Sequence, residues 1–171
     1  MQRTPQRALT LLEMLITLVI LSILLTMAAP AFRDMMEKQR LKGASRDVYL
    51  LFTLARNEAI AKSTDIRVAA VRKDDGWFIG ITDKDKHCDP SLTVPRLDDR
   101  SCTLRNYRGN DLPTLARLSH ERYPGITLDN NRNLIFYSRG TAYNGSFTLK
   151  AERIGEQRKV IVSVIGRTRT E

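Results

Sequence analysis

A single carboxylate, Glu13, lies near the start of a long apolar stretch, and its position requires a chemical explanation. A charged side chain in a membrane-length helix costs at least a few kcal/mol, so such residues usually have a function and a partner. The stretch from Leu9 to Ala31 is long enough to cross a bilayer with some tilt. Arg3 and Arg7 precede it, which predicts a cytoplasmic N-terminus and places the rest of the chain across the membrane.

A second group of chemically suggestive residues, G-R-T-R, occupies positions 166–169 near the C-terminus. In an extended segment alternate side chains share a face, so Arg167 and Arg169 would point together, about 6.7 Å apart. Each guanidinium can donate two hydrogen bonds to one phosphate, and Gly166 would free the backbone to turn or to approach phosphates closely. Such contacts would bind a phosphate backbone without reading a base sequence. Two arginines near a C-terminus can also be a solvated chain end, and both interpretations stay open.

Other cations could extend this tail into a patch. The formal net charge is +9, and such a surplus favours polyanions such as nucleic acid, anionic lipid or surface polysaccharide. Arg158 and Lys159 lie in the last predicted hairpin, whereas Arg105 and Arg108 lie in a middle region rich in arginine. If that region folds beside the tail, all four join one basic patch; otherwise they form separate solvated surfaces.

Three tyrosines near these cations could stack on the bases of single strands. Packing against the sheet or against the base of the middle loop is the interpretation that we favour for them. They are Tyr107, Tyr123 and Tyr143.

The two cysteines, Cys88 and Cys102, predict a disulfide if the domain is exported to an oxidising compartment. The bridge would close a loop of about 15 residues, worth roughly 3 kcal/mol in the chain-entropy model. Asp83, Asp85 and His87 lie close to Cys88 and could suggest a metal. No second soft ligand stands at metal-site spacing, so no metal is expected.

Catalysis finds little support in the sequence. His87 and His120 have no serine or cysteine nucleophile at a recognisable motif spacing. No glycine-rich loop of the kind that cradles phosphates is present either. We therefore expect neither enzymatic activity nor a cofactor.

The elements that must position these residues begin with one long helix. Beyond the apolar stretch, apolar residues recur at i, i+3, i+4 and i+7, which predicts an amphipathic continuation over 32–63. Pro30 should kink the helix, because proline removes one backbone hydrogen bond and clashes with the preceding turn. The predicted buried stripe is Leu41, Ala44, Val48, Leu51, Phe52, Ala55 and Ala59.

Past residue 63 the apolar period changes from 3.6 to 2, which indicates strands. The predicted strands are 66–71, 77–82, 134–137, 146–152 and 159–165, with an irregular region over 83–124. The fold class is therefore α+β: a long N-terminal helix packed on a small antiparallel β-sandwich-like head.

The N-terminal residues resemble the class III signal of type IV pilins and pseudopilins. The resemblance implies that a prepilin peptidase cuts between Ala8 and Leu9, which is then N-methylated, and that Glu13 and Pro30 occupy characteristic family positions. Glu13 would pair with the free α-amine of a neighbouring subunit. The family normally has Gly and Phe at the two cleavage positions. An ordinary secretory signal has a shorter apolar region, and a simple membrane anchor leaves Glu13 unexplained.

The remaining chain resembles FimT/GspH-type pseudopilins through segments such as D-G-W-F-I-G-I, L-I-F-Y-S-R-G and K-V-I-V-S-V-I-G-R. This resemblance implies a leader at 1–8, a transmembrane and filament-core helix at 9–31, its amphipathic continuation at 32–63, and a periplasmic head at 64–171. It also implies an inner-membrane protein that assembles with other pilin subunits at or near a pilus tip. The C-terminal G-R-x-R resembles the DNA-binding tail of FimT proteins in natural competence.

Two kinds of function therefore follow from the resemblance. One is a minor pilin that binds extracellular DNA for uptake in natural transformation. The alternative is a FimU- or GspH-like structural adaptor of a type IV pilus or type II secretion pseudopilus that never touches DNA. A weaker third option is contact with anionic surface polysaccharide.

Overall fold

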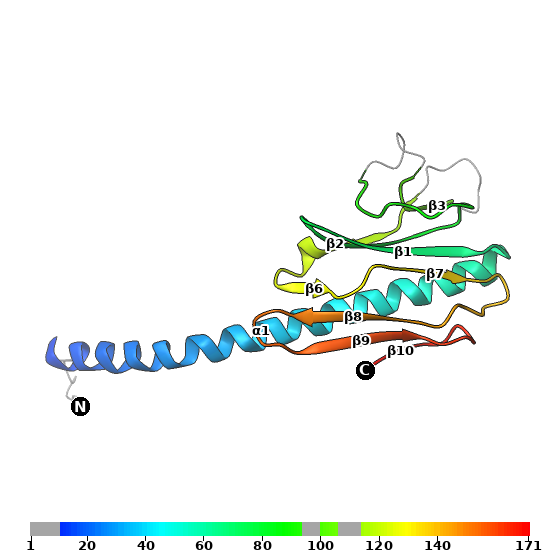
Figure 1. Cartoon of the computed structure of the whole chain (residues 1–171). Helices are drawn as coiled ribbons and strands as arrows, with labels where there is room; N and C mark the ends of the chain where they lie inside the picture. The colour runs from blue at the N-terminus through cyan, green and yellow to red at the C-terminus, as the bar shows by residue number, and fades with distance from the viewer. Residues whose placement is uncertain (1–10, 94–99, 106–113) are drawn as a thin grey trace, which may run out of the picture. The chain divides into compact units, whose positions relative to one another are not determined.

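The computed structural model describes residues 11–93, 100–105 and 114–171 (Figure 1). The chain divides into two compact units, Met1–Met36 and Glu37–Glu171, of which the second is called the head unit below. One helix, α1 (Leu11–Lys62), contributes residues to both units.

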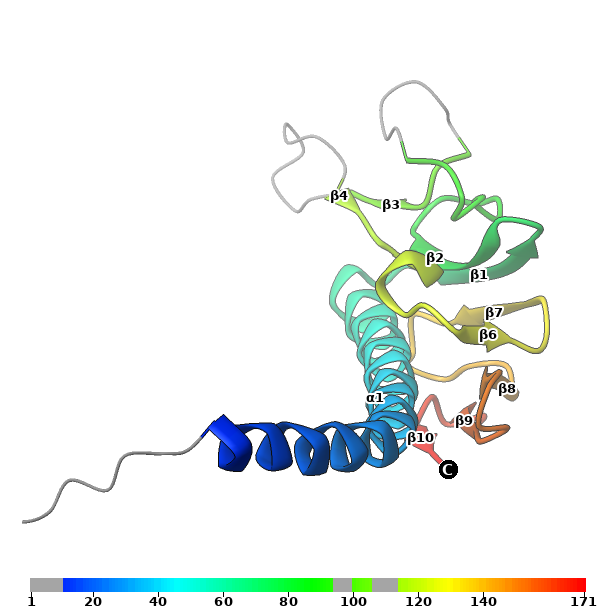
Figure 2. The ribbon, with the colours of Figure 1, turned by 90° about the vertical axis from the view of Figure 1, so that its left-hand side faces the viewer.

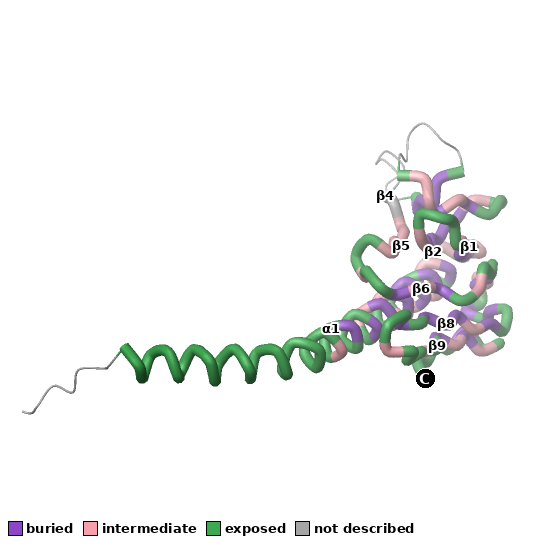
Figure 3. Tube along the Cα trace, turned by 60° about the vertical axis from the view of Figure 1, so that its left-hand side comes forward, coloured by how far each residue is buried: buried purple, intermediate pink, exposed green. Residues whose placement is uncertain are grey.

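The described part of the first unit is a helix with no core of its own. Residues 11–33 are exposed, as the colouring of Figure 3 shows, and the apolar side chains among them include Leu11 at 85% and Met27 at 73% exposure. By length and hydropathy α1 contains a segment able to cross a membrane. The helix runs through Pro30 as predicted, whereas the kink stays a prediction.

In the head unit, α1 turns one apolar stripe toward the sheets. All seven residues predicted from the periodicity are buried, and Glu37 and Ser45 join them. The strands lie along one side of this part of the helix (Figure 2). The ring of Phe52 contacts the rings of Phe136 and Phe147, with centroids 6.3 and 4.9 Å away. The helix therefore supplies one wall of the head's core.

The first sheet has the order β5-β2-β1-β7, and all its pairs are antiparallel. The predicted hairpin is confirmed as β1 (Ile66–Lys73) and β2 (Gly76–Thr82), in which Ala70 faces Ile79. The other two strands are β5 (Arg117–Ser119) and β7 (Arg132–Phe136). The last of these begins two residues before the predicted strand at 134–137.

The second sheet has the order β10-β9-β8-β6 and is also antiparallel. Its strands are β6 (Ile126–Leu128), β8 (Gly145–Ala151), β9 (Gln157–Val162) and β10 (Thr168–Thr170). The indole N–H of Trp77 in β2 donates to the carbonyl of Ile126 in β6 at 2.8 Å and so connects the two sheets. The predicted last hairpin is confirmed, but β9 ends at Val162 rather than at residue 165.

The prediction of an irregular region over 83–124 is wrong in part. It contains β3 (Thr103–Leu104), β4 (Thr114–Leu115), β5 and the short 3-10 helix η1 (His120–Arg122). Strands of two or three residues are too short to show alternation in the sequence. The pairing of β5 with β2 is therefore visible only in the folded structure.

The predicted disulfide joins Cys88 to Cys102, whose Cα atoms lie 4.9 Å apart. Its sulfur packs over β2 at Gly80, where a Cβ would lie 2.5 Å from the Cys102 Sγ. The bridge therefore fastens the segment between β2 and β3 onto the first sheet, and glycine at position 80 makes that close approach possible.

Candidate functional site

The residues predicted to act in cleavage and assembly lie on α1 or just before it in the sequence. Glu13 is in the first turn of α1 and Pro30 lies within the helix. The predicted cleavage residues Ala8 and Leu9 lie outside the described residues. Apolar side chains cover this unit, and such surface is unfavourable in water. This unit therefore needs a membrane or a protein partner around it.

The C-terminal G-R-T-R is not a free tail. Backbone bonds pair β10 with β9 so that Arg169 faces Ile161, and Ser163 N–H donates to the carbonyl of Arg167 at 3.0 Å. Gly166 occupies the turn between these strands at φ +72°. Its left-handed conformation confirms the expected turn, but the residue is buried within the fold rather than free to approach a ligand.

Three of the predicted cations share one face of the second sheet. Val160 and Val162 are buried, so the alternation of β9 turns Lys159 and Ile161 outward. Arg169 shares the face of its partner Ile161. Arg167 lies one residue before β10, and its bond from Ser163 N–H continues the same register, so the alternation assigns it to this face as well. All three cations are exposed. The outer basic face, as we call it, consists of Lys159, Arg167 and Arg169.

One carboxylate, that of Glu171, lies beside the cations of this face and pairs with one of them. The Glu171 Oε1 lies 2.9 Å from Arg169 Nη2 in an exposed ion pair. Glu171 also exchanges both backbone hydrogen bonds with Lys159, at 2.8 Å each, so it stands directly opposite that lysine. Any anion that binds this face must therefore compete with the Glu171 carboxylate.

Arg158 does not belong to the outer basic face. It is the strand neighbour of Lys159 and pairs with the buried Leu149, so its side chain starts from the opposite face of the sheet. Our placement of both residues in one patch was therefore wrong for Arg158. Adjacent residues of a paired strand cannot present their side chains to the same surface.

Arg105 also lies elsewhere. It follows β3, and its backbone N–H and Nε both donate to Asp83 Oδ2, at 3.0 and 3.4 Å. Figures 1 and 2 place β3 and β10 at opposite ends of the head's stacked strands. The structure therefore does not bring Arg105 to the tail, because β3, which pairs with β4 and accepts a hydrogen bond from the Thr82 hydroxyl of β2, holds it at the other end. Arg108 lies outside the described residues.

The predicted packing of the tyrosines is confirmed for one and wrong for another. Tyr123 packs against the core cluster and its hydroxyl donates to Asp47 Oδ2 at 2.5 Å. Burial, together with that bond to a carboxylate, raises the pKa of Tyr123 to about 12. Tyr143, by contrast, is 61% exposed. Tyr107 lies outside the described residues.

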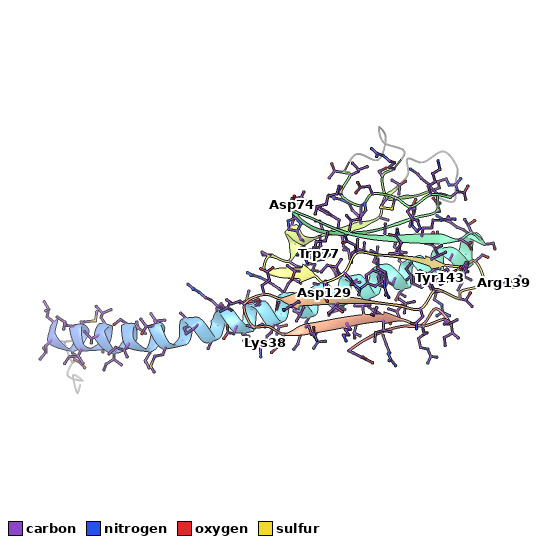
Figure 4. The ribbon with its side chains drawn as sticks, in the orientation of Figure 1. Lys38, Asp74, Trp77, Asp129, Arg139 and Tyr143 are labelled. Carbon is purple, nitrogen blue, oxygen red and sulfur yellow. A yellow bond between two sulfur atoms is a disulfide. The ribbon has the colours of Figure 1, made fainter. Side chains whose placement is uncertain are left out.

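Sequence reasoning missed a junction of two turns beside the outer basic face. Arg56 of α1 donates from Nε to the carbonyl of Gly140 at 3.1 Å and from Nη2 to the carbonyl of Ile165 at 3.3 Å. The two-turn junction comprises residues 137–141 and 163–167. Arg139 on its first turn and Tyr143, two residues after that turn, are exposed, and Figure 4 labels both near the C-terminal end of α1. The sequence holds no signal for this junction, because it depends on contacts between Arg56 and residues 84 and 109 positions away along the chain.

The apolar helix of the first unit and the antiparallel β head together define a type IV pilin-like subunit. Residues 44–166 match the protein family described as Type II transport protein GspH, and residues 3–29 match the prokaryotic N-terminal methylation motif. The chain belongs to the GspH family and is a minor type IV pilin or pseudopilin of that family.

Two solved structures share this fold. One is the type IV minor pilin FimU of Pseudomonas aeruginosa, at 19% identity and a TM-score of 0.52, with 79% of this chain and 90% of FimU covered. The other is the minor pseudopilin EpsH from the type 2 secretion system of Vibrio cholerae, at 15% identity and a TM-score of 0.51, with 77% and 96% covered. No curated protein sequence matches the chain significantly.

Proposed function

We propose that this minor pilin binds DNA through the outer basic face and delivers it for uptake in natural transformation. The observation that carries the proposal is the placement of Lys159, Arg167 and Arg169 on one exposed sheet face. The pairing of β10 with β9 fixes the backbone from which the two guanidinium groups extend, and each group can donate two hydrogen bonds to a phosphate. Contacts of this kind bind the backbone independently of sequence.

The test is fluorescence anisotropy of the full chain in neutral-detergent micelles with a labelled duplex, over a salt series. Binding through two or three phosphates should be weak and should weaken steeply with salt. Arg167→Gln/Arg169→Gln should lower the affinity and reduce the slope of log K against log salt by about 2.

A matched control removes the same charge elsewhere. Arg72→Gln/Arg132→Gln removes two exposed arginines of the first sheet and leaves the outer basic face intact. It should retain the wild-type salt slope. If both double variants bind alike, or if the wild type does not bind at low salt, DNA capture by this face is wrong.

The assembly steps belong to the same proposal. A prepilin peptidase would cut between Ala8 and Leu9, Leu9 would be N-methylated, and Glu13 would pair with the α-amine of another subunit. The membrane cost of a carboxylate supports such a partner. The head would then reach the periplasm and, after assembly, the cell surface. Intact-mass measurement after coexpression with a peptidase tests the cut, and co-purification of Glu13→Ala with other pilins tests the pairing.

A second function, that of a structural adaptor, is favoured by apolar side chains on the head part of α1. Leu50, Leu54 and Ile60 are 49%, 42% and 49% exposed. Leu50 and Leu54 are one helical turn apart, so they form a small apolar ridge suited to a neighbouring subunit. Leu50→Ser/Leu54→Ser should weaken co-purification with partner pilins and leave the affinity for DNA unchanged.

A further inference from the structure

The two-turn junction is a rigid platform. Arg56 joins its two turns from one side chain, as described above. The main chain joins them as well, because Ala142 N–H donates to the carbonyl of Val164 at 2.9 Å. Tyr143 N–H donates to the carbonyl of Ile135 at 3.2 Å. Side chains on these turns are therefore held in place by β7, β9 and α1 together.

Several large apolar side chains on or beside this platform are exposed to solvent. Val164 and Ile165 are 63% and 60% exposed, and Tyr143 beside them is 61% exposed. The ring of Tyr137 lies 5.8 Å from that of Tyr143, tilted by 49°. The Tyr143 side chain is the main cause of a raised pKa at Tyr137. Tyr137 therefore restrains the Tyr143 ring from one side while the rest stays open to solvent.

Two cations lie on the turns of the junction. Arg139 lies in the first turn and Arg167 closes the second, and both are exposed. Neither guanidinium has an ion pair with a carboxylate among the residues that the structure describes. Asp65, which contacts the first turn, accepts the backbone N–H of Ser138 at 3.0 Å. The junction thus combines an open aromatic face with two guanidinium groups.

A ligand that fits this combination must offer flat apolar faces and regularly spaced negative charge. Duplex DNA offers the phosphates but hides its base faces in the stack, whereas a single strand offers both. We propose that the two-turn junction binds single-stranded DNA, with a base stacked on Tyr143 and neighbouring phosphates on Arg139 and Arg167. This inference rests on the proposed DNA contact of the outer basic face, with which it shares Arg167.

Substitution of Tyr143 should therefore change the affinity for single-stranded DNA more than the affinity for duplex DNA. With the full chain in neutral-detergent micelles, labelled oligothymidylate of about 15 nucleotides is compared with its duplex with oligoadenylate. Tyr143→Ala should weaken binding of the single strand roughly tenfold, since stacking on an aromatic ring has about that effect, and should change duplex binding by less than about twofold. Tyr143→Phe keeps the ring and should bind both forms like the wild type.

A second measurement keeps the test independent of any change in folding. A single strand carrying 5-iodouracil is irradiated on the wild-type chain, and the cross-linked peptide is identified by mass spectrometry. We expect the cross-link at Tyr143, because this photochemistry favours a stacked aromatic ring. A cross-link confined to other residues would overturn the inference.

The outcomes separate this inference from the proposed function. If Tyr143→Ala leaves single-strand binding unchanged while Arg167→Gln/Arg169→Gln weakens it, the stacking inference is wrong and the basic face still binds DNA. If the wild type binds neither form, the proposed function itself fails, and this inference fails with it.

Discussion

The α-carbon of Gly166 faces the carbonyl oxygen of Gly140 so closely that a Cβ on Gly166 would lie 2.0 Å from that oxygen. Gly166 also has φ +72°, which L side chains adopt only with strain. The glycine of the G-R-T-R segment is therefore required by the packing of one turn on another. It fixes the position from which Arg167 and Arg169 extend.

Gly166→Ala should destabilise the head for two reasons. The left-handed conformation costs about 1–2 kcal/mol for a residue with a Cβ, and the overlap with Gly140 adds about 1–3 kcal/mol. Gly155→Ala is the matched control, because Gly155 has φ +70° but nothing within 4 Å of its Cβ position. Urea unfolding should show the larger loss at position 166. Equal losses would mean that the turns do not pack as described.

Arg56→Met should loosen the two-turn junction. The variant keeps most of the apolar stem but removes the donors to the carbonyls of Gly140 and Ile165. The expected loss in the free energy of unfolding is about 1–2 kcal/mol for two partly exposed bonds. Hydrogen exchange at Ala142 N–H and Gly166 N–H should also become faster. Arg46→Met, at an exposed position of the same helix, should change neither quantity.

Glu171→Gln should strengthen DNA binding if the outer basic face is the site. The substitution removes the carboxylate that pairs with Arg169 at 2.9 Å, so a phosphate no longer has to displace it. An exposed pair is worth about 0.2–1 kcal/mol, which corresponds to a gain of roughly 1.5- to 5-fold in affinity for duplex DNA. The anisotropy assay measures it. Glu152→Gln removes one negative charge from an exposed position outside this face and should have a smaller effect.

Tyr123 should make the stability of the head fall at high pH. Its pKa is about 12 in the folded chain, above the ordinary value of 10.0, so folding favours the protonated phenol. That contribution is complete below about pH 10 and is lost as the pH rises through about 12. Absorbance titration of phenolate should reveal this late-titrating tyrosine. Asp47→Ala should lower its pKa, and Tyr123→Phe should remove this part of the pH dependence. An unchanged titration in Asp47→Ala would contradict the assignment.

Removing the disulfide should destabilise the head without unfolding its core. Cys88→Ser/Cys102→Ser loses the constraint on the unfolded chain, which for this loop is worth about 3 kcal/mol in the chain-entropy model. The bridge lies over the outer side of β2, away from the cluster around Phe52. Thermal unfolding should show a lower midpoint in the variant, and wild type kept in reductant should match it.

The sequence by itself determined the long helix and its buried face, because seven apolar residues at helical spacing leave only one side to bury. It also determined the hairpin of β1 and β2 and that of β8 and β9, since each joins alternating runs through a short turn. The disulfide followed from a pair of cysteines. All these features depend on residues that are neighbours along the chain or equivalent in a repeating period.

Tertiary structure alone decided which cations act together. Pairing of β10 with β9 put Arg167 and Arg169 beside Lys159 and excluded Arg158, and the position of β3 removed Arg105. The junction depends on Arg56 reaching carbonyls 84 and 109 residues away along the chain. Periodicity describes only which way a side chain faces within its own element. Which elements then lie side by side is decided by packing between distant segments, and that packing left Tyr143 exposed next to the two turns that carry Arg139 and Arg167.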